Sequence, residues 1–370
     1  MDYINKLIFE TGAFDFSDDT EKLFNNAMLQ CFNYHYNNSE MYKKICDSRN
    51  INPDIVKKYI DIPDVFVTVL KTWEFITGSK ENVKLTLSSS GTGGQKSFIY
   101  LDEKSLVNIQ KIVKEIFSSL GMADTRVTNY VCFTYDPEVA SDVGTAFSDK
   151  MLTSLTGVGE VFYTMQFDKT KNDFVLDIDK TIEKLDKFSK MSNPVRILGF
   201  PAHLYFSLLE YKKRYNKTLN LTEGSFVITG GGWKNHAGEE IPKAEFKNIL
   251  SQMLGISVQN IRDHFGMVEH GIPYVDCEYG NLHIPVYSRA HTFNPYNETI
   301  QNYENEGLLM LFSPYVNSYP SISLLTTDKA AIREHCPCGR GPYIDLIGRA
   351  GLNKHKGCAI AAIEKLKSGG

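Results

Sequence analysis

Apolar side chains recur at helical spacing near the start of the chain. They stand three or four positions apart, at Leu23, Ala27, Cys31 and Tyr34. This spacing places them on one side of an α-helix, and Asp18-Asp19-Thr20 before them is a typical helix start. The pair Asn38-Ser39 interrupts the pattern, which continues to Cys46. The sequence therefore predicts that residues 1–80 form a helical N-terminal part.

Beyond Ile62-Pro63 the pattern becomes an alternation of short apolar runs and longer helical stretches. We expect strands at Lys84–Leu87, Tyr130–Phe133, Arg196–Gly199, Ser225–Thr229 and Leu308–Phe312, and helices at 102–120, 202–216 and 243–254. A Ser/Gly turn separates the first strand from the first helix, which predicts the order strand, loop, helix. The whole pattern predicts an α/β fold with a multi-stranded sheet and flanking helices.

Composition and charge exclude several classes of protein. The chain has 370 residues, 42% of them apolar, enough for one large domain or two ordinary ones. Its formal net charge of -4 gives no basis for an electrostatic hold on nucleic acid. The segment from Met1 to Ile4 is not a basic region followed by an apolar run, and no apolar stretch approaches the roughly 20 residues that span a bilayer. We therefore expect a cytoplasmic protein without a membrane span.

The segment from Leu87 to Ser97 is rich in glycine and in small hydroxyl residues. It exposes backbone N–H groups and hydroxyls, and a lysine adds positive charge, a combination that suits a polyphosphate such as that of ATP. The spacing differs from the Walker pattern of a glycine, four residues and then Gly-Lys-Ser/Thr. A flexible loop without a ligand is the alternative. The residues concerned are Ser88, Ser89, Ser90, Gly91, Thr92, Gly93, Gly94 and Lys96.

Five segments, in the same order along the chain, resemble the motifs of the adenylate-forming enzymes, the superfamily of acyl-CoA synthetases and luciferases. They are the loop ending in Lys96, the glycine-ended strand 227–232, the aromatic-Gly-x-x-Glu segment 265–269, the segment 319–328 and the Gly-Arg hinge 347–349. Each motif alone is common, whereas five in sequence order are specific. The resemblance implies the large domain of such an enzyme, with ATP and Mg²⁺ as cofactors.

The resemblance also implies a role for single residues. Gly230, Gly231 and Gly232, together with Phe265 and Gly266, would line the nucleotide. Glu269 would hold Mg²⁺ against the phosphates, Asp328 would accept hydrogen bonds from the ribose hydroxyls, and Arg349 would contact the nucleotide. A buried structural role is the alternative for Glu269 and for Asp328.

Cysteine usage points to a metal. The seven cysteines are an odd number spread unevenly, which favours ligands and nucleophiles over a disulfide framework. Cys277, His283, Cys336 and Cys338 stand in two pairs around turns, and three thiolates with an imidazole suit tetrahedral Zn²⁺ without a position for water. We therefore predict a structural zinc, with His335 as an alternative to His283 and ordinary buried cysteines as the alternative to a metal. The phenylacetate-CoA ligase branch of the superfamily has a similar Cys-x-Cys-Gly-Arg segment.

The end of the chain carries a further thiol. Cys358 stands among lysines and a histidine in the segment 353–360, and nearby positive charge lowers the pKa of a thiol. The ending Lys-Gly-Cys-Ala, with the segments 228–234 and 261–263, resembles the acyl-protein synthetases of the LuxE family. That family belongs to the fatty acid reductase complex of bacterial bioluminescence. Members form an acyl-adenylate, take the acyl group onto a C-terminal cysteine and deliver it to a partner reductase.

The resemblance implies a complete reaction for this chain. A fatty acid would be adenylated and passed to Cys358, with Lys96, Lys234 or a tail lysine stabilising the negative charge, and then to an acyl reductase of the LuxC type. Two alternatives stay open: transfer to CoA or a carrier protein, and an inactive nucleotide-binding subunit. We expect an adenylate-forming domain over residues 1–349, without the usual C-terminal small domain, and a short flexible tail over 350–370.

Overall fold

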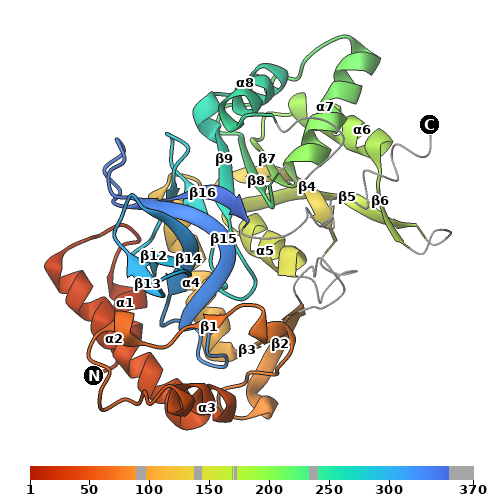
Figure 1. The fold of residues 1–370 in the computed structure, drawn as a ribbon. Helices are drawn as coiled ribbons and strands as arrows, with labels where there is room; N and C mark the ends of the chain where they lie inside the picture. Colours follow the sequence, from red (N-terminus) through yellow and green to blue (C-terminus); the bar gives the residue numbers. More distant parts are fainter. Residues whose placement is uncertain (89–96, 137–143, 169, 171–172, 233–240, 350–370) are drawn as a thin grey trace. The chain divides into compact units, whose positions relative to one another are not determined.

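The structure is a computed structural model that describes residues 1–88, 97–136, 144–168, 170, 173–232 and 241–349 (Figure 1). The chain divides into two compact units. Among the described residues, the first unit consists of 1–88, 97–120 and 266–349. The second unit consists of the described residues between 121 and 265. No helix in these described ranges is both long and apolar enough to cross a membrane.

The second unit is an α/β layer around a mainly parallel sheet. The strand order is β9-β8-β7-β4-β5-β6, with β6 antiparallel to β5 and the other described pairs parallel. The strands are β4 (Val127–Tyr135), β5 (Gly157–Asp168), β6 (Asp173–Leu176), β7 (Val195–Gly199), β8 (Phe226–Gly230) and β9 (Ile261–Phe265). The helices are α5 (Gly144–Thr153), α6 (Ile178–Ser189), α7 (Pro201–Tyr215) and α8 (Lys243–Leu254), with a 3₁₀ turn at Val258–Asn260.

Alternation along the strands builds the core of this second unit. Val131, Ile197 and Val227 point to one face of the sheet, where they join apolar residues of α6, α7 and α8 in one buried cluster. Full burial of each such side chain contributes roughly 1.5–3 kcal/mol. Because β4, β7, β8 and β9 are parallel neighbours, their carboxyl ends lie along one edge of the sheet.

The first unit is built on an antiparallel sheet with helices. The described strand order is β13-β12-β14-β15-β16-β11-β10, with β1 parallel beside β15 and a separate β2-β3 hairpin. The strands are β1 (Val65–Phe66), β2 (Val83–Ser88), β3 (Phe98–Asp102), β10 (Tyr274–Asp276), β11 (Leu282–His283), β12 (Arg289–Asn294), β13 (Thr299–Gln301), β14 (Glu306–Phe312), β15 (Ser323–Arg333) and β16 (Tyr343–Arg349). The helices are α1 (Tyr3–Glu10), α2 (Asp18–Asn38), α3 (Glu40–Ser48) and α4 (Glu103–Ser119), with 3₁₀ turns at Tyr59–Asp61, Val69–Lys71 and Lys80–Asn82.

The expected mixed α/β fold is confirmed, with two local differences. Helix α2 is capped by Ser17, one residue before the predicted start: its hydroxyl accepts the Thr20 N–H at 3.2 Å, and the Thr20 hydroxyl accepts the Ser17 N–H at 2.8 Å. The predicted order strand, loop, helix was wrong, because β3 precedes α4. This strand pairs back on β2, with Ser88 opposite Phe98 and Thr86 opposite Tyr100.

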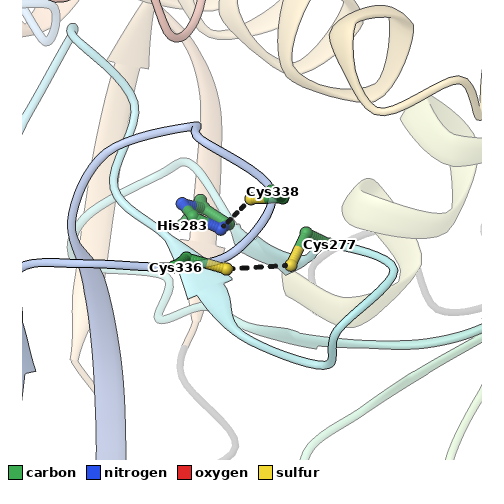
Figure 2. Close-up of side chains that lie close together, drawn as sticks. All are labelled: Cys277, His283, Cys336 and Cys338. Carbon is green, nitrogen blue, oxygen red and sulfur yellow. Dashed lines mark hydrogen bonds between the residues drawn. The ribbon is translucent and has the colours of Figure 1, made fainter.

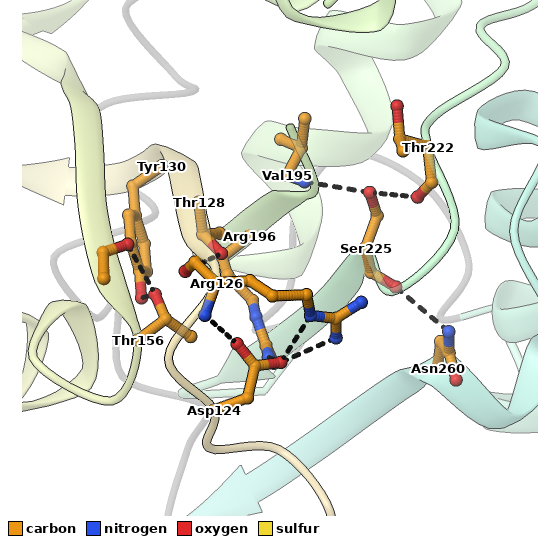
Figure 3. Close-up of polar contacts among 11 residues, drawn as sticks. Asp124, Arg126, Thr128, Tyr130, Thr156, Val195, Arg196, Thr222, Ser225 and Asn260 are labelled. Atoms are coloured by element: carbon orange, nitrogen blue, oxygen red, sulfur yellow. Dashed lines mark hydrogen bonds and ion pairs between the residues drawn. The ribbon is translucent and has the colours of Figure 1, made fainter. Parts of the chain in front are cut away.

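A buried arginine, whose polar contacts are drawn in Figure 3, lies on the face of the second unit's sheet opposite the α6–α8 cluster. Tyr130, Arg196 and Phe226 are register partners on three neighbouring strands. The Arg196 guanidinium lies 4.4 Å from the centre of the Phe226 ring, and its side chain is 3% exposed. Its Nη2 is 3.9 Å from Asp124 Oδ2, which also accepts hydrogen bonds from Arg126 at 2.6 and 3.0 Å. Asp124 is therefore the carboxylate that balances a buried charge.

Replacing Asp124 with asparagine should lower the free energy of unfolding by about 2 kcal/mol. Removing one partner of a fully buried pair costs about 3–5 kcal/mol, and the effect is smaller here because Asp124 is partly exposed. Urea unfolding measures the change. Asp179→Asn is the matched control, since Asp179 pairs with Arg214 at the surface and its loss should cost at most about 0.5 kcal/mol. Equal losses in the two variants would contradict a structural role for the Asp124 pair.

Candidate nucleotide and metal sites

The described nucleotide residues of the second unit lie at the carboxyl edge of its parallel strands. Gly230 ends β8, and Phe265 ends the neighbouring strand β9. A Cβ on Gly230 would stand 2.3 Å from the His264 ring, so the close packing of β9 requires glycine there. Gly231 and Gly232 follow with φ values of 83° and 70°, which favour glycine, and both are exposed. Ligands of open α/β sheets bind at this edge.

A buried carboxyl group that the sequence analysis missed lies at the same edge. Asp149 on α5 is 5% exposed and accepts a hydrogen bond from the hydroxyl of Thr134, near the end of β4. Burial raises its pKa to about 7, although the Thr134 hydroxyl acts in the opposite direction. An aspartate in a short helical stretch carries no sequence signal of burial, which depends on packing between α5 and β4.

Asp149→Asn should remove a fall in stability with rising pH. The unfolded chain releases the Asp149 proton near pH 3.8, whereas the folded chain keeps it until about pH 7. Between these values the unfolded state binds fewer protons, so stability falls as pH rises, by about 4 kcal/mol at most. Asparagine has no proton to release and still accepts from Thr134. The variant should match the parent near pH 4 and be more stable at pH 8, as measured by urea unfolding; parallel pH profiles would contradict this.

Glu269, in the first unit, is a buried carboxylate. It is 8% exposed, and no other residue of the described ranges forms a hydrogen bond or an ion pair with it. The nearby Tyr319 hydroxyl is also buried and lacks a hydrogen-bond partner within the described part. Burial raises the pKa of Tyr319, and the negative charge of Glu269 adds to this effect. A buried charge without a partner is costly, and a hard cation such as Mg²⁺ is the ligand that oxygen donors of this kind accept.

Asp328 and Arg349, also in the first unit, are brought together by strand pairing. They are register partners on β15 and β16, and Arg349 Nε lies 3.4 Å from Asp328 Oδ1. The Asp328 side chain is 16% exposed and that of Arg349 64%. The pair therefore presents a carboxylate and an accessible guanidinium side by side, a combination able to bind hydroxyl groups and phosphate oxygens.

The remaining predicted nucleotide and acyl residues are described only in part. Ser88 is buried at the end of β2, and Gly266 begins the part of the first unit that contains Glu269. Outside the described residues lie Ser89, Ser90, Gly91, Thr92, Gly93, Gly94, Lys96, Lys234 and Cys358. The roles predicted for all these residues stay predictions.

Four predicted metal ligands converge in the first unit (Figure 2). Cys277 follows β10, His283 ends β11, and the loop between β15 and β16 supplies Cys336 and Cys338. One donor atom of each lies within 4.8 Å of the others. Cys277 Sγ and Cys336 Sγ are 3.7 Å apart, close to the edge of about 3.8 Å of a tetrahedron with Zn–S bonds of about 2.3 Å.

The surroundings of the cluster shift the pKa values of its donor groups. Burial lowers the pKa of His283 to about 4, with Arg340 adding to the effect, so the imidazole is neutral and able to ligate. Its Nε2 lies 3.0 Å from Cys338 Sγ. Burial raises the pKa of the Cys277 thiol to about 12, which a bound dication would reverse. The alternative ligand His335 is 90% exposed and is not in the cluster.

Comparison with solved structures identifies the class of the fold. The chain resembles 2-hydroxyisobutyryl-CoA ligase in an open conformation, in complex with 2-HIB-AMP and CoA, with a TM-score of 0.70, 14% identity, and coverage of 91% of this chain and 76% of that one. The same ligase in its thioesterification state gives a TM-score of 0.71 and covers 91% and 69%. The chain therefore has the fold of the adenylate-forming ligases.

The family follows from the sequence as a whole. The model of the family described as "Acyl-protein synthetase, LuxE" matches residues 1–367, and the chain belongs to this family. The "Long-chain-fatty-acid--luciferin-component ligase" of Aliivibrio fischeri is 26% identical over 366 residues, covering 97% of this chain and 93% of that protein. The ligase of the same name from Vibrio harveyi is 25% identical over 368 residues, covering 97% and 92%. The predicted resemblance to LuxE proteins is confirmed.

Proposed function

We propose that the chain activates a long-chain fatty acid with ATP and carries the acyl group on Cys358. The observation that carries this proposal is the family match over residues 1–367, which includes both the described motif residues and the segment around Cys358. The two relatives named above are ligases of long-chain fatty acids that match nearly the whole chain.

The first half-reaction forms the acyl-adenylate. A carboxylate oxygen of the fatty acid attacks the α-phosphorus of ATP, and the bond to the β-phosphate oxygen breaks to release pyrophosphate. The loop 88–96 would bind the phosphates, and Glu269 would hold the Mg²⁺ that travels with ATP and neutralises phosphate charge. This role fits a buried carboxylate without a partner among the described residues. Gly230 to Gly232 and Phe265 line the nucleotide, and Asp328 accepts hydrogen bonds from the ribose hydroxyls beside Arg349.

The second half-reaction moves the acyl group to sulfur. The Cys358 thiolate attacks the acyl carbon, the bond to the phosphate oxygen breaks, and AMP leaves with the electron pair. Lys96 or Lys234 stabilises the negative charge of the transition state. The tail over 350–370, after an adenylate-forming domain over 1–349, then presents the thioester to an acyl reductase of the LuxC type. We place the protein in the cytoplasm, where thiols stay reduced.

The metal of the Cys/His cluster is proposed to be one structural Zn²⁺. Cys277, His283, Cys336 and Cys338 would fill its four positions, so the ion would tie the β10-β11 turn to the β15-β16 loop. Zinc supplies no step of the proposed reaction.

Intact mass measurement tests the proposed function. The protein is incubated with Mg-ATP and a panel of fatty acids, pyrophosphate is assayed, and any adduct is located by peptide sequencing. A hydroxylamine-labile acyl mass on Cys358 is the expected result. Pyrophosphate release without an adduct on Cys358 would keep the adenylation and move the acceptor to CoA or a carrier protein. ATP binding without pyrophosphate release for any acid would indicate an inactive subunit.

A further inference from the structure

The backbone around Glu269 forms a tight, closely packed turn within the first unit. The N–H groups of His270 and Gly271 both donate to the carbonyl of Met267, at 3.0 and 3.1 Å. Gly271 has a φ of 88°, and a Cβ there would lie 3.1 Å from a side-chain carbon of Ile109 on α4. The turn therefore lies directly against α4, and its conformation depends on glycine.

The residue after Glu269 is held at two points. The His270 ring is fully buried, stacks on Tyr274 with ring centroids 5.4 Å apart, and its Nε2 lies 2.8 Å from the Tyr274 hydroxyl. The carbonyl of His270 accepts a hydrogen bond from the Tyr315 hydroxyl at 2.8 Å.

Tyr315 is itself fixed by a second buried contact. It is fully buried, and its carbonyl accepts a hydrogen bond from Asn108 Nδ2 on α4 at 2.9 Å. A line of buried hydrogen bonds thus runs from α4 through Asn108 and Tyr315 to the backbone beside Glu269. Breaking it would leave the carbonyl of His270 without its donor in a place that water does not reach, which is unfavourable for a buried polar group.

We propose that Tyr315 and His270 are positioning residues that hold the Glu269 carboxylate in place for the Mg²⁺ of Mg-ATP. The inference rests on the proposed function, because it assigns Glu269 to that metal. Mg²⁺ demands near-ideal octahedral geometry with oxygen atoms at about 2.0–2.1 Å, so a loosened turn binds it less well. Residues that orient metal ligands typically change metal affinity by about 10–100-fold when removed.

Tyr315→Phe tests the inference, because it deletes only the hydroxyl that donates to His270. Tyr287→Phe is the matched control: Tyr287 is also fully buried in the first unit, and its hydroxyl donates to the carbonyl of Thr11 at 2.7 Å rather than to the turn that contains Glu269. The probe is Mn²⁺ with ATP, whose binding to the full-length protein is followed by electron paramagnetic resonance. We expect Mn²⁺-ATP to bind about 10-fold more weakly to the Tyr315 variant than to the control. Equal affinities in the two variants would overturn the inference.

A kinetic measurement separates positioning from a general loss of stability. In fatty-acid-dependent exchange of pyrophosphate into ATP, Tyr315→Phe should raise the Mg²⁺ concentration for half-maximal rate and leave the rate at saturating Mg²⁺ close to that of the control. A lower rate at saturating Mg²⁺ with an unchanged half-point would contradict positioning. A parent protein without any exchange would refute the proposed function, whereas the binding comparison would still decide the inference. Unchanged Mn²⁺-ATP binding in Glu269→Gln would refute both the assignment of Glu269 and the inference.

Discussion

Replacing Cys358 with serine is expected to abolish the acyl adduct and to leave pyrophosphate release in place. A serine hydroxyl has a far higher pKa than a thiol and supplies almost no anion at neutral pH, and losing a nucleophile costs about 10³-fold or more in rate. Intact mass after incubation with Mg-ATP and fatty acid measures the adduct, and a pyrophosphate assay follows the first half-reaction.

A buried thiol provides the control for this experiment. Cys31 is 2% exposed, and burial raises its pKa, so it should carry no acyl group. Cys31→Ala should therefore keep the adduct at the level of the parent. A full adduct in the Cys358 variant would show that another residue accepts the acyl group. Undiminished transfer to added CoA by that variant would support a ligase that uses an external thiol.

Removal of the metal should destabilise the first unit strongly. We expect the purified protein to contain one zinc per chain, and Cys336→Ser to lose it together with about 4 kcal/mol or more of stability. The reason is that the ligands come from two separate segments, β10-β11 and the β15-β16 loop, which the ion would join. Metal analysis of the dialysed protein and thermal unfolding measure the two effects.

Two comparisons sharpen the metal experiment. Cys46→Ser replaces a buried thiol of the first unit outside the cluster, so it should keep the zinc. His283→Ala should lose zinc and His335→Ala should keep it, because only His283 lies with the thiols. A protein prepared in zinc-containing medium with less than a tenth of an equivalent of metal would contradict the assignment. An unchanged zinc content in Cys336→Ser would do so as well.

The identity of the fold could be predicted from short motifs. The glycines after β8, the aromatic-Gly-x-x-Glu segment and the Asp328 and Arg349 motifs are local in sequence, and backbone requirements explain several of them. Gly230, for example, must lack a Cβ because His264 stands against it. Such requirements leave a sequence pattern that can be recognised without the structure, whereas the functional roles of these residues stay predictions.

The structure corrected one prediction that depended on a longer-range contact and revealed buried residues that the sequence did not indicate. Strand β3 was missed because it is defined by its antiparallel pairing with β2, which precedes the Ser/Gly segment. A local sequence pattern does not reveal such a pairing partner. Asp149 and Arg196 look like ordinary polar residues in the sequence, yet both are buried by elements that lie elsewhere in the chain. Helix α2 differed from the prediction by a single residue at its cap, since helix periodicity and capping are local.

The sequence by itself determined the helical start of the chain, the mixed α/β class, the order of the motifs and the set of soft metal donors, because each depends on neighbouring residues or on residue type. Only the tertiary structure decided that His283, rather than His335, joins the three thiols, because that choice depends on how β11 pairs with β16. The tertiary structure also decided that Tyr315 and Asn108 support the turn that contains Glu269. Tyr315 lies about forty-five positions after this turn in the sequence, and Asn108 lies more than a hundred and fifty positions before it. Contacts between distant segments come from packing, and packing leaves no local pattern.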